Sequence, residues 1–109
     1  MEQIDDVIAT REIDILDLAG QPAGKIHVYI GRPKQKETGE WGCPFQIAGI
    51  GSGRTFWGFG LDAIQAIEGA FKVIGGTLAG TIEAQEGRLH WDGETDLGFP
   101  LPPTPPVKP

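Results

Sequence analysis

Apolar and polar residues alternate in the first third of the chain, and this period of two is typical of strands with one buried and one solvated face. Residues 8–18 (IATREIDILDL) and 25–30 (KIHVYI) both show it. Residues 19–24 (AGQPAG) separate them with two glycines and a proline, which favour a turn. The pattern predicts an antiparallel hairpin, followed by an exposed loop over the polar residues 31–40.

A second pair of strands is predicted between residues 41 and 60. Four apolar residues of the first strand share one face, because they occupy alternate positions: Trp41, Cys43, Phe45 and Ile47. Pro44 lies among them without a backbone N–H, which predicts an edge, a bulge or a late start at that point. After a glycine-rich turn, RTFWGFG at 54–60 is the predicted partner strand.

The glycine-rich run GIGSGRTFWGFG at 49–60 has the glycine content of a phosphate-binding loop but not its spacing. The dinucleotide pattern G-x-G-x-x-G needs a glycine at position 54 or 56, which hold Arg54 and Phe56. A P-loop needs Gly-Lys-Ser or Gly-Lys-Thr, and the sequence contains neither. The run therefore predicts a hairpin turn, and we expect no cofactor.

Residues 61–87 change to the three-and-four spacing of an amphipathic helix. Its predicted apolar face consists of Ile64, Ile67, Phe71, Ile74, Leu78 and Ile82. Asp62 and Gln65 have the spacing of a capping box, and Leu61 is placed to staple onto Ala66. The glycine pair at 75–76 disfavours the helical conformation, so the sequence does not predict where the helix ends. RLHW at 88–91 predicts a short final strand.

These elements predict an α+β fold: an antiparallel sheet of about four strands in meander order, packed against one long helix and followed by a short final strand. The last thirteen residues contain six prolines, which favours an extended tail that lies along the domain through Leu97, Phe99 and Leu101. We therefore expect one domain over residues 1–96 and a proline-rich tail over 97–109.

Composition narrows the class of partner. The net charge of −6 argues against binding to nucleic acid or to anionic membranes, since both need clustered Lys and Arg. The single cysteine, Cys43, cannot form an intramolecular disulfide, and the acidic N-terminus is unlike a secretory signal. No apolar run has the length of about 18 residues that a transmembrane helix needs. A cytoplasmic location is expected.

Candidate chemistry is sparse. His27 and His90 are the only histidines, and no spacing typical of metal ligands accompanies them, so no metal site is predicted. Cys43 shares its strand face with large apolar residues, which favours a buried thiol over a nucleophile. Asp62 is accounted for as a helix cap. No catalytic residue is predicted, and an enzyme is the less favoured interpretation.

Aromatic residues are in surplus on the strand at 54–60. Phe56 points to the opposite face from Trp57 and Phe59, so one half-buried strand cannot bury all three. Exposed aromatics often mark surfaces that bind partners. Together with Arg54, these three residues are the predicted partner-binding residues.

A set of motifs resembles a small bacterial domain family of unknown function: WGCPFQI at 41–47, GIG at 49–51, FGLDAIQAI at 59–67, GRLHW at 87–91 and LGFP at 97–100. The resemblance covers residues 8–101, and Ala63 and Ile64 stand where the family pattern has Ser and Leu. It implies the fold class and a bacterial origin, but no activity. The layout of a sheet followed by an acid-capped helix is also similar to antitoxins of the HicB type.

Two functional hypotheses follow. The first is a non-enzymatic cytoplasmic domain that binds another protein or a second copy of itself, of the immunity, antitoxin or inhibitor kind. The alternative is a small-ligand binder or an enzyme that uses a cleft between sheet and helix, with Arg54, His90 and Asp62 as its polar groups. The missing catalytic set favours the first.

Overall fold

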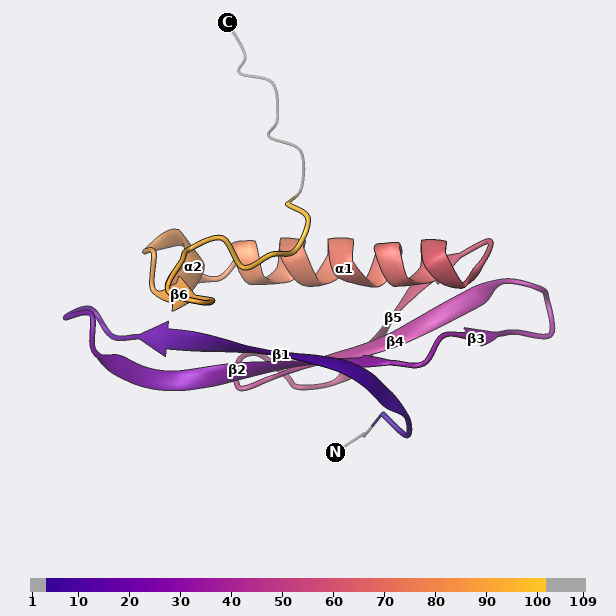
Figure 1. Cartoon of the computed structure of the whole chain (residues 1–109), viewed down its shortest axis with the longest axis horizontal. Helices are drawn as coiled ribbons and strands as arrows, with labels where there is room; N and C mark the ends of the chain where they lie inside the picture. The colour runs from indigo at the N-terminus through magenta and orange to yellow at the C-terminus, as the bar shows by residue number, and fades with distance from the viewer. Residues whose placement is uncertain (1–3, 102–109) are drawn as a thin grey trace, which may run out of the picture.

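The structure is a computed structural model that describes residues 4–101. One long helix lies across a twisted antiparallel sheet, and the C-terminal segment returns over that helix (Figure 1). The elements are, in chain order, β1 (Val7–Leu16), β2 (Pro22–Gly31), β3 (Lys34–Gln35), β4 (Trp41–Ala48), β5 (Thr55–Gly60), α1 (Ala63–Ala79), α2 (Ile82–Gln85) and β6 (Leu89–His90). The predicted α+β class is confirmed.

The sheet contains six strands, whereas about four and a short final strand are predicted; β6 is the predicted final strand, and β3 is the strand that was not expected. The long strands β1, β2, β4 and β5 pair in chain order, as a meander does. Two strands of two residues each complete the sheet: β3 pairs with the start of β4, inside the predicted loop, and β6 pairs with β1. Phe45 pairs with Ile30 of β2 and with Phe56 of β5, so these two strands lie on opposite edges of β4.

Pro44 lies within an unbroken β4, and the irregularity it predicts is found in the partner strands. On one edge of β4, pairing with β2 begins at Phe45 and pairing with β3 ends at Gly42. Residues 43 and 44 fall in the gap between the two. The missing N–H of proline is tolerated at such an interruption of the ladder.

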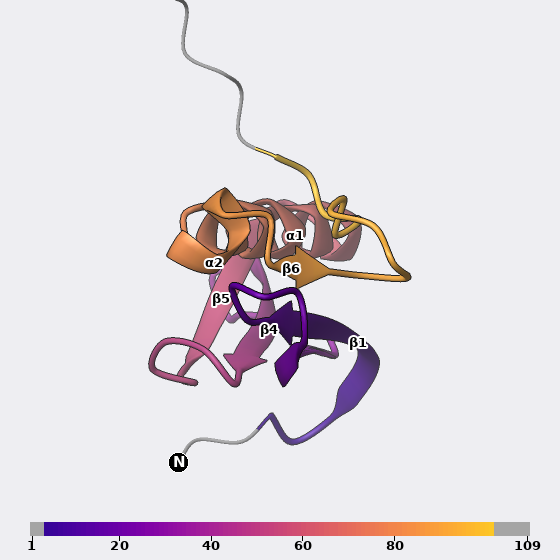
Figure 2. The same cartoon turned by 90° about the vertical axis from the view of Figure 1, so that its left-hand side faces the viewer.

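The core lies between the helix and one face of the sheet. The predicted inward face of β4 is confirmed, because Cys43, Phe45 and Ile47 are buried. They pack with apolar residues of β1, β2, β6 and α1: Ile13, Ile26, Val28, Ile30, Ala66, Ala70, Ile74, Leu78 and Leu89. Figure 2 shows both helices and the C-terminal segment on this side of the sheet. Asp6 O accepts from Arg32 N at 2.9 Å and so continues the pairing of β1 with β2, while Ile4 lies beside Pro44 and Trp57.

Helix α1 begins as its capping residues predict. Asp62 Oδ1 accepts from Gln65 N at 2.8 Å, and Gln65 Oε1 accepts from Leu61 N at 2.7 Å. The predicted staple is wrong, because Leu61 is 86% exposed. The predicted apolar face is wrong in part: Ile64 and Ile82 are exposed, whereas the small residues Ala66 and Ala70 are fully buried.

The helix continues through the glycine pair and ends at Ala79. Gly75 is where the C-terminal segment crosses α1. A Cβ at Gly75 would overlap the carbonyl oxygen of Pro100 and lie 3.0 Å from its carbonyl carbon. A Cβ at Gly76 would have no neighbour within 4 Å. Only the first glycine is therefore required by packing.

The C-terminal segment is held by Arg11, a residue for which the sequence pattern predicts no such role. Its guanidinium lies 3.8 Å from the ring centre of Trp91 and 4.9 Å from that of Phe99, and it donates to Leu97 O at 3.1 Å. Phe99 also packs on Phe71, with ring centres 5.9 Å apart. We call these contacts of Arg11 the arginine clamp. Leu97 and Phe99 thus lie along the domain as predicted, while Leu101 is exposed and residues 102–109 of the predicted tail lie outside the described residues.

Candidate functional site

Strand β5 lies directly against helix α1 because two of its residues are glycines. A Cβ at Gly58 would lie 2.6 Å from Ala66 O and 2.7 Å from Ala70 Cα, and one at Gly60 would lie 2.6 Å from Ala66 N. These distances leave no room for any side chain. The helix therefore turns alanines, rather than its isoleucines, toward β5.

The aromatic residues of β5 lie on both sides of the sheet. In the register with β4, Trp57 is opposite Pro44 and Phe59 opposite Gly42, on the face away from α1, and Phe56 is opposite Phe45 on the helix face. Their exposed fractions are 52% for Phe56, 43% for Trp57 and 47% for Phe59. The prediction that at least one of the three lies outside the core is confirmed, and in fact all three do.

On the face away from the helix, Trp57 and Phe59 border a hollow of about 410 Å³, whose other lining residues are Lys34, Lys36 and Gly42. We call it the lysine hollow. A Cβ at Gly42 would lie 3.0 Å from Trp57 Cε3 and 3.5 Å from Phe59 Cε1, so the missing side chain lets both rings lie across the strand. Lys36 Nζ lies 4.2 Å from the ring centre of Phe59.

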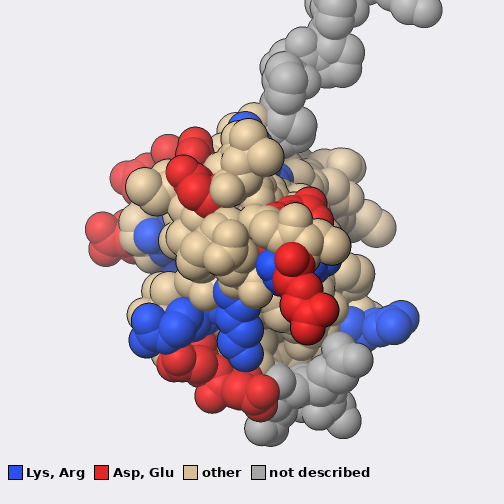
Figure 3. Space-filling model, turned by 90° about the vertical axis from the view of Figure 1, so that its right-hand side faces the viewer, with Lys and Arg blue, Asp and Glu red and all other residues tan. Residues whose placement is uncertain are grey.

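The lysine hollow is locally cationic on an acidic protein. Lys36 Nζ is 3.9 Å from Glu40 Oε2, and Lys34 has no ion-pair partner among residues 4–101. Nearby, Asp6 is occupied by Arg32, with 2.6 Å between Oδ2 and Nε. Figure 3 faces this end of the molecule and shows Lys and Arg side chains across its lower part, with Asp and Glu side chains directly below and beside them.

On the helix face, Phe56 borders a groove of about 310 Å³ between α1 and the turn that joins β4 to β5. We call it the apolar groove. Phe45 and Ile47 of β4, Ile50 of the turn and Val73 of α1 line it. The rings of Phe45 and Phe56 stack with centres 6.1 Å apart, and Val73 is 47% exposed. Arg54, the fourth predicted partner-binding residue, also lines this groove.

The turn beside the apolar groove confirms the hairpin interpretation of the glycine run. Gln46 pairs with Thr55 across it, and Gly49, Gly51 and Gly53 have φ of 101°, 64° and 68°. Glycine adopts this left-handed conformation without steric cost. The three glycines are therefore explained by the shape of the turn.

The outer edge of β5 carries no partner strand: among residues 4–101, β5 pairs with β4 alone. Its sequence, TFWGFG, contains neither a charged residue nor a proline. Charged residues, proline and short length are the usual means by which proteins protect an edge strand from pairing with another chain. The β1 side of the sheet differs, because β1 carries Arg11, Glu12 and Asp14 and is partly paired with β6.

The polar residues predicted for an alternative ligand cleft are not brought together. Asp62 caps the start of α1, whereas His90 lies on β6, near the opposite end of that helix, where its Nε2 is 3.0 Å from Gly87 O (Figure 1). Arg54 lies at the turn before β5. The structure thus offers no common cleft for these three side chains.

The remaining groups have structural roles. Cys43 is fully buried as predicted, and burial raises the pKa of its thiol, which therefore stays protonated. His27 lies on the solvated face of β2, where its Nε2 is 3.3 Å from Glu12 Oε2. Glu12 also accepts a hydrogen bond from Lys25, which lowers the pKa of the Glu12 carboxyl group. Among residues 4–101, no group of His, Cys, Asp or Glu is arranged to hold a metal ion.

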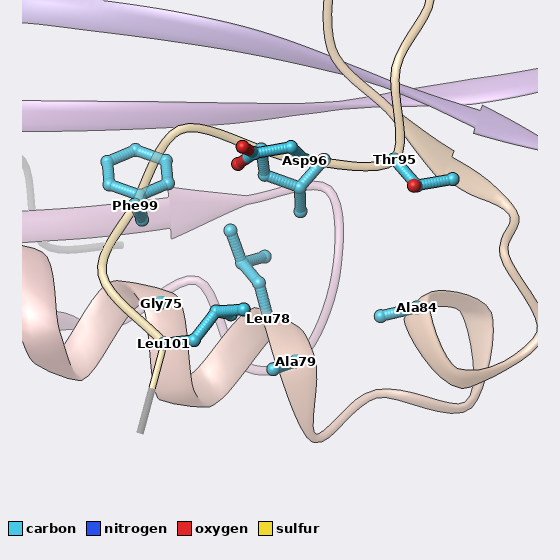
Figure 4. A pocket seen from close by; sticks show the side chains of 9 residues that line it. Gly75, Leu78, Ala79, Ala84, Thr95, Asp96, Phe99 and Leu101 are labelled. Carbon is cyan, nitrogen blue, oxygen red and sulfur yellow. The ribbon is translucent and has the colours of Figure 1, made fainter. Parts of the chain in front are cut away.

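A larger groove of about 660 Å³ lies between the helices and the C-terminal segment. In Figure 4, Leu78 of α1 faces Asp96 and Phe99 of the segment across it, and Leu101 lies at its rim. Asp96 Oδ1 already accepts from Gly98 N at 2.9 Å, within the segment's own turn. One oxygen of this carboxylate is thus used within the segment, and most of the other lining residues are apolar.

A family model described as Domain of unknown function (DUF6968) matches residues 9–101. The chain belongs to this family. The predicted resemblance to a family of unknown function is thereby confirmed, while bacterial origin stays a prediction. No curated protein and no solved structure matches the chain. The DUF6968 region contains β5, both of its hollows and every residue of the arginine clamp. Within residues 4–101, no helix is long and apolar enough to cross a bilayer.

Proposed function

We propose that this DUF6968 domain binds a partner protein through strand β5, by adding an extended segment of the partner to the open edge of the sheet. One observation carries the proposal: β5 is an unprotected edge strand with three exposed aromatic residues. Strand addition uses main-chain hydrogen bonds for affinity and side-chain pockets for specificity. Both requirements meet at β5.

Close packing on α1 suits β5 to this role. An isolated strand at an edge is easily deformed, but Gly58 and Gly60 place the backbone of β5 directly on the helix. A partner segment would therefore pair with a strand that is already in its bound shape, which lowers the entropic cost of association. The main conformational entropy cost that remains is the ordering of the partner's own segment.

The kind of partner expected from the sequence, a target of an immunity, antitoxin or inhibitor protein, fits this mode of binding and stays a prediction. The alternative of a small-ligand site formed by Arg54, His90 and Asp62 is not favoured, since these residues lie on separate parts of the molecule.

Photo-crosslinking tests the proposal. A photoreactive aromatic side chain, which keeps a ring at this position, replaces Trp57 in one variant and, as the control, Ile82, which is 68% exposed on α2. In lysate of the source cell, we expect a discrete crosslinked protein from position 57 and none of that mass from position 82. Trp57→Ala should weaken capture of that protein by about 2 kcal/mol or more, since aromatic hot spots have this magnitude. Equal crosslinking from both positions, or none from position 57, would contradict the proposal.

A further inference from the structure

The two hollows beside β5 specify the chemistry of the segment that it accepts. This inference rests on the proposed function. Side chains of a strand paired with β5 would point alternately to the two faces of the sheet. Those that point toward α1 would meet the apolar groove, and those that point away would meet the lysine hollow. Successive side chains of an added strand would thus contact the apolar groove and the lysine hollow in turn.

The apolar groove fits an aliphatic or aromatic side chain. Phe56 and Val73 are each about half exposed and lie at its mouth, and buried Phe45 forms its floor. An apolar side chain there would cover both exposed residues and gain roughly 25 cal/mol for each Å² removed from water. A cationic side chain would lose its hydration against the apolar walls and would be repelled by Arg54, which also lines the groove.

The lysine hollow fits a carboxylate. Lys34 and Lys36 supply ammonium groups to it, and the half-exposed rings of Trp57 and Phe59 form its aromatic wall. Glu40 is the one carboxylate that contacts Lys36 among the described residues, at a distance typical of a weak ion pair. A bound Asp or Glu would add a second partner for Lys36 and an ion-pair partner for Lys34. A cationic side chain would be repelled.

We propose that β5 binds an extended segment in which apolar residues alternate with Asp or Glu, with the apolar side chains in the apolar groove and the carboxylates in the lysine hollow. Because the whole domain has a net charge of −6, long-range attraction of an acidic partner is not expected. Selectivity for acidic side chains should instead arise at contact, from the two lysines.

Fluorescence anisotropy with labelled peptides of about eight residues, a usual strand length, tests this. One peptide alternates valine with glutamate, a second valine with lysine, and a third valine with serine; a fourth has the composition of the first, with its valines and glutamates in blocks. We expect the valine–glutamate peptide to bind about tenfold or more tighter than the others, a difference equal to about 1.4 kcal/mol. NMR should show its largest amide shifts at residues 55–60.

Charge variants supply the matched controls. Lys36→Gln should weaken binding of the valine–glutamate peptide by severalfold, whereas Lys25→Gln should not, although Lys25 and Lys36 are exposed to the same degree, 51% and 49%. The double variant Lys34→Glu with Lys36→Glu should reverse the preference, so that the valine–lysine peptide binds tighter. Circular dichroism checks that each variant is folded.

Each contrary outcome is distinct. If the three alternating peptides bind equally at β5, the inference is wrong and the proposed strand addition stands. If no peptide binds, or if the amide shifts fall outside residues 55–60, both are wrong. If the domain is a dimer that Trp57→Ala dissociates, a second copy occupies the edge and the acidic segment is ruled out.

Discussion

The adjacent glycines of α1 give a sharp test of how the C-terminal segment is held. Gly75→Ala and Gly76→Ala make the same chemical change one residue apart in the same helix. Alanine is favoured over glycine in a helix interior by about 1 kcal/mol, so propensity alone predicts that both variants are more stable. Packing separates them, because only Gly75 faces the carbonyl group of Pro100.

The expected magnitudes follow from what must move. At Gly76 the new methyl group has no neighbour within 4 Å, and the gain of about 1 kcal/mol should be realised in full. At Gly75 the methyl group overlaps Pro100 O, a backbone atom that cannot rotate away. Residues 99–101 must then lift from α1, and the contacts of Phe99 with Phe71 and Arg11 are strained or lost. Overpacking of this kind costs about 1–3 kcal/mol.

Because the gain in helix propensity is the same at both positions, we expect the free energy of unfolding of Gly75→Ala to lie about 1–3 kcal/mol below that of Gly76→Ala. Urea denaturation followed by circular dichroism measures it. The fluorescence of Trp91, which lies under Arg11, should change in folded Gly75→Ala and not in Gly76→Ala, with Trp41 and Trp57 replaced by phenylalanine to isolate the signal. If both variants are stabilised equally, the segment does not rest on Gly75, and our account of the glycine pair is wrong.

Three further predictions concern the site. Trp57→Ala should lower the free energy of unfolding by less than about 2 kcal/mol, and Phe71→Ala should lower it by more. Phe45→Ala, which removes a fully buried ring, should lower it by about 3–5 kcal/mol. If urea titrations show equal losses for Trp57→Ala and Phe45→Ala, Trp57 belongs to the core. ATP, GTP and NAD at millimolar concentration should leave the melting temperature unchanged, whereas a ligand at 100-fold excess over its Kd would stabilise by about 2.7 kcal/mol and raise it. Cys43 should resist a thiol reagent at neutral pH until urea unfolds the domain, and rapid labelling of the native protein would show that its burial is incomplete.

The elements whose formation depends on residues close together in the sequence could be predicted from it. The alternation of apolar and polar residues predicts the long strands. The capping pair Asp62 and Gln65 predicts the start of α1, which begins at Ala63 with Asp62 as its N-cap. The buried face of α1 could not be read in the same way. Large apolar residues dominate a helical pattern, but the close approach of Gly58 selects Ala66 and Ala70, and this approach is a tertiary contact.

The candidate site was predictable in its aromatic residues and in Arg54, but not in its two lysines. Alternation alone shows that Phe56, Trp57 and Phe59 cannot share one face. The two lysines of the hollow come from a segment that has no apolar pattern and was expected to be a loop, and its pairing with β4 brings them beside Phe59. Arg11 was missed for a similar reason, since a lone arginine on an amphipathic strand gives no sign of a distant aromatic partner.

The arginine clamp also constrains the order in which this chain can fold. The hydrogen bond from Arg11 to Leu97 joins residues 86 positions apart, and the clamp's other partners, Trp91 and Phe99, are equally late in the sequence. Contacts of such long separation form only after the cost of closing the intervening loop has been met. During synthesis, β1 and β2 can pair early, but Arg11 must wait for the last residues of the DUF6968 region. Closure of the clamp is therefore expected as a late step in the folding of this domain, after the strand pairs between β1 and β2 have formed.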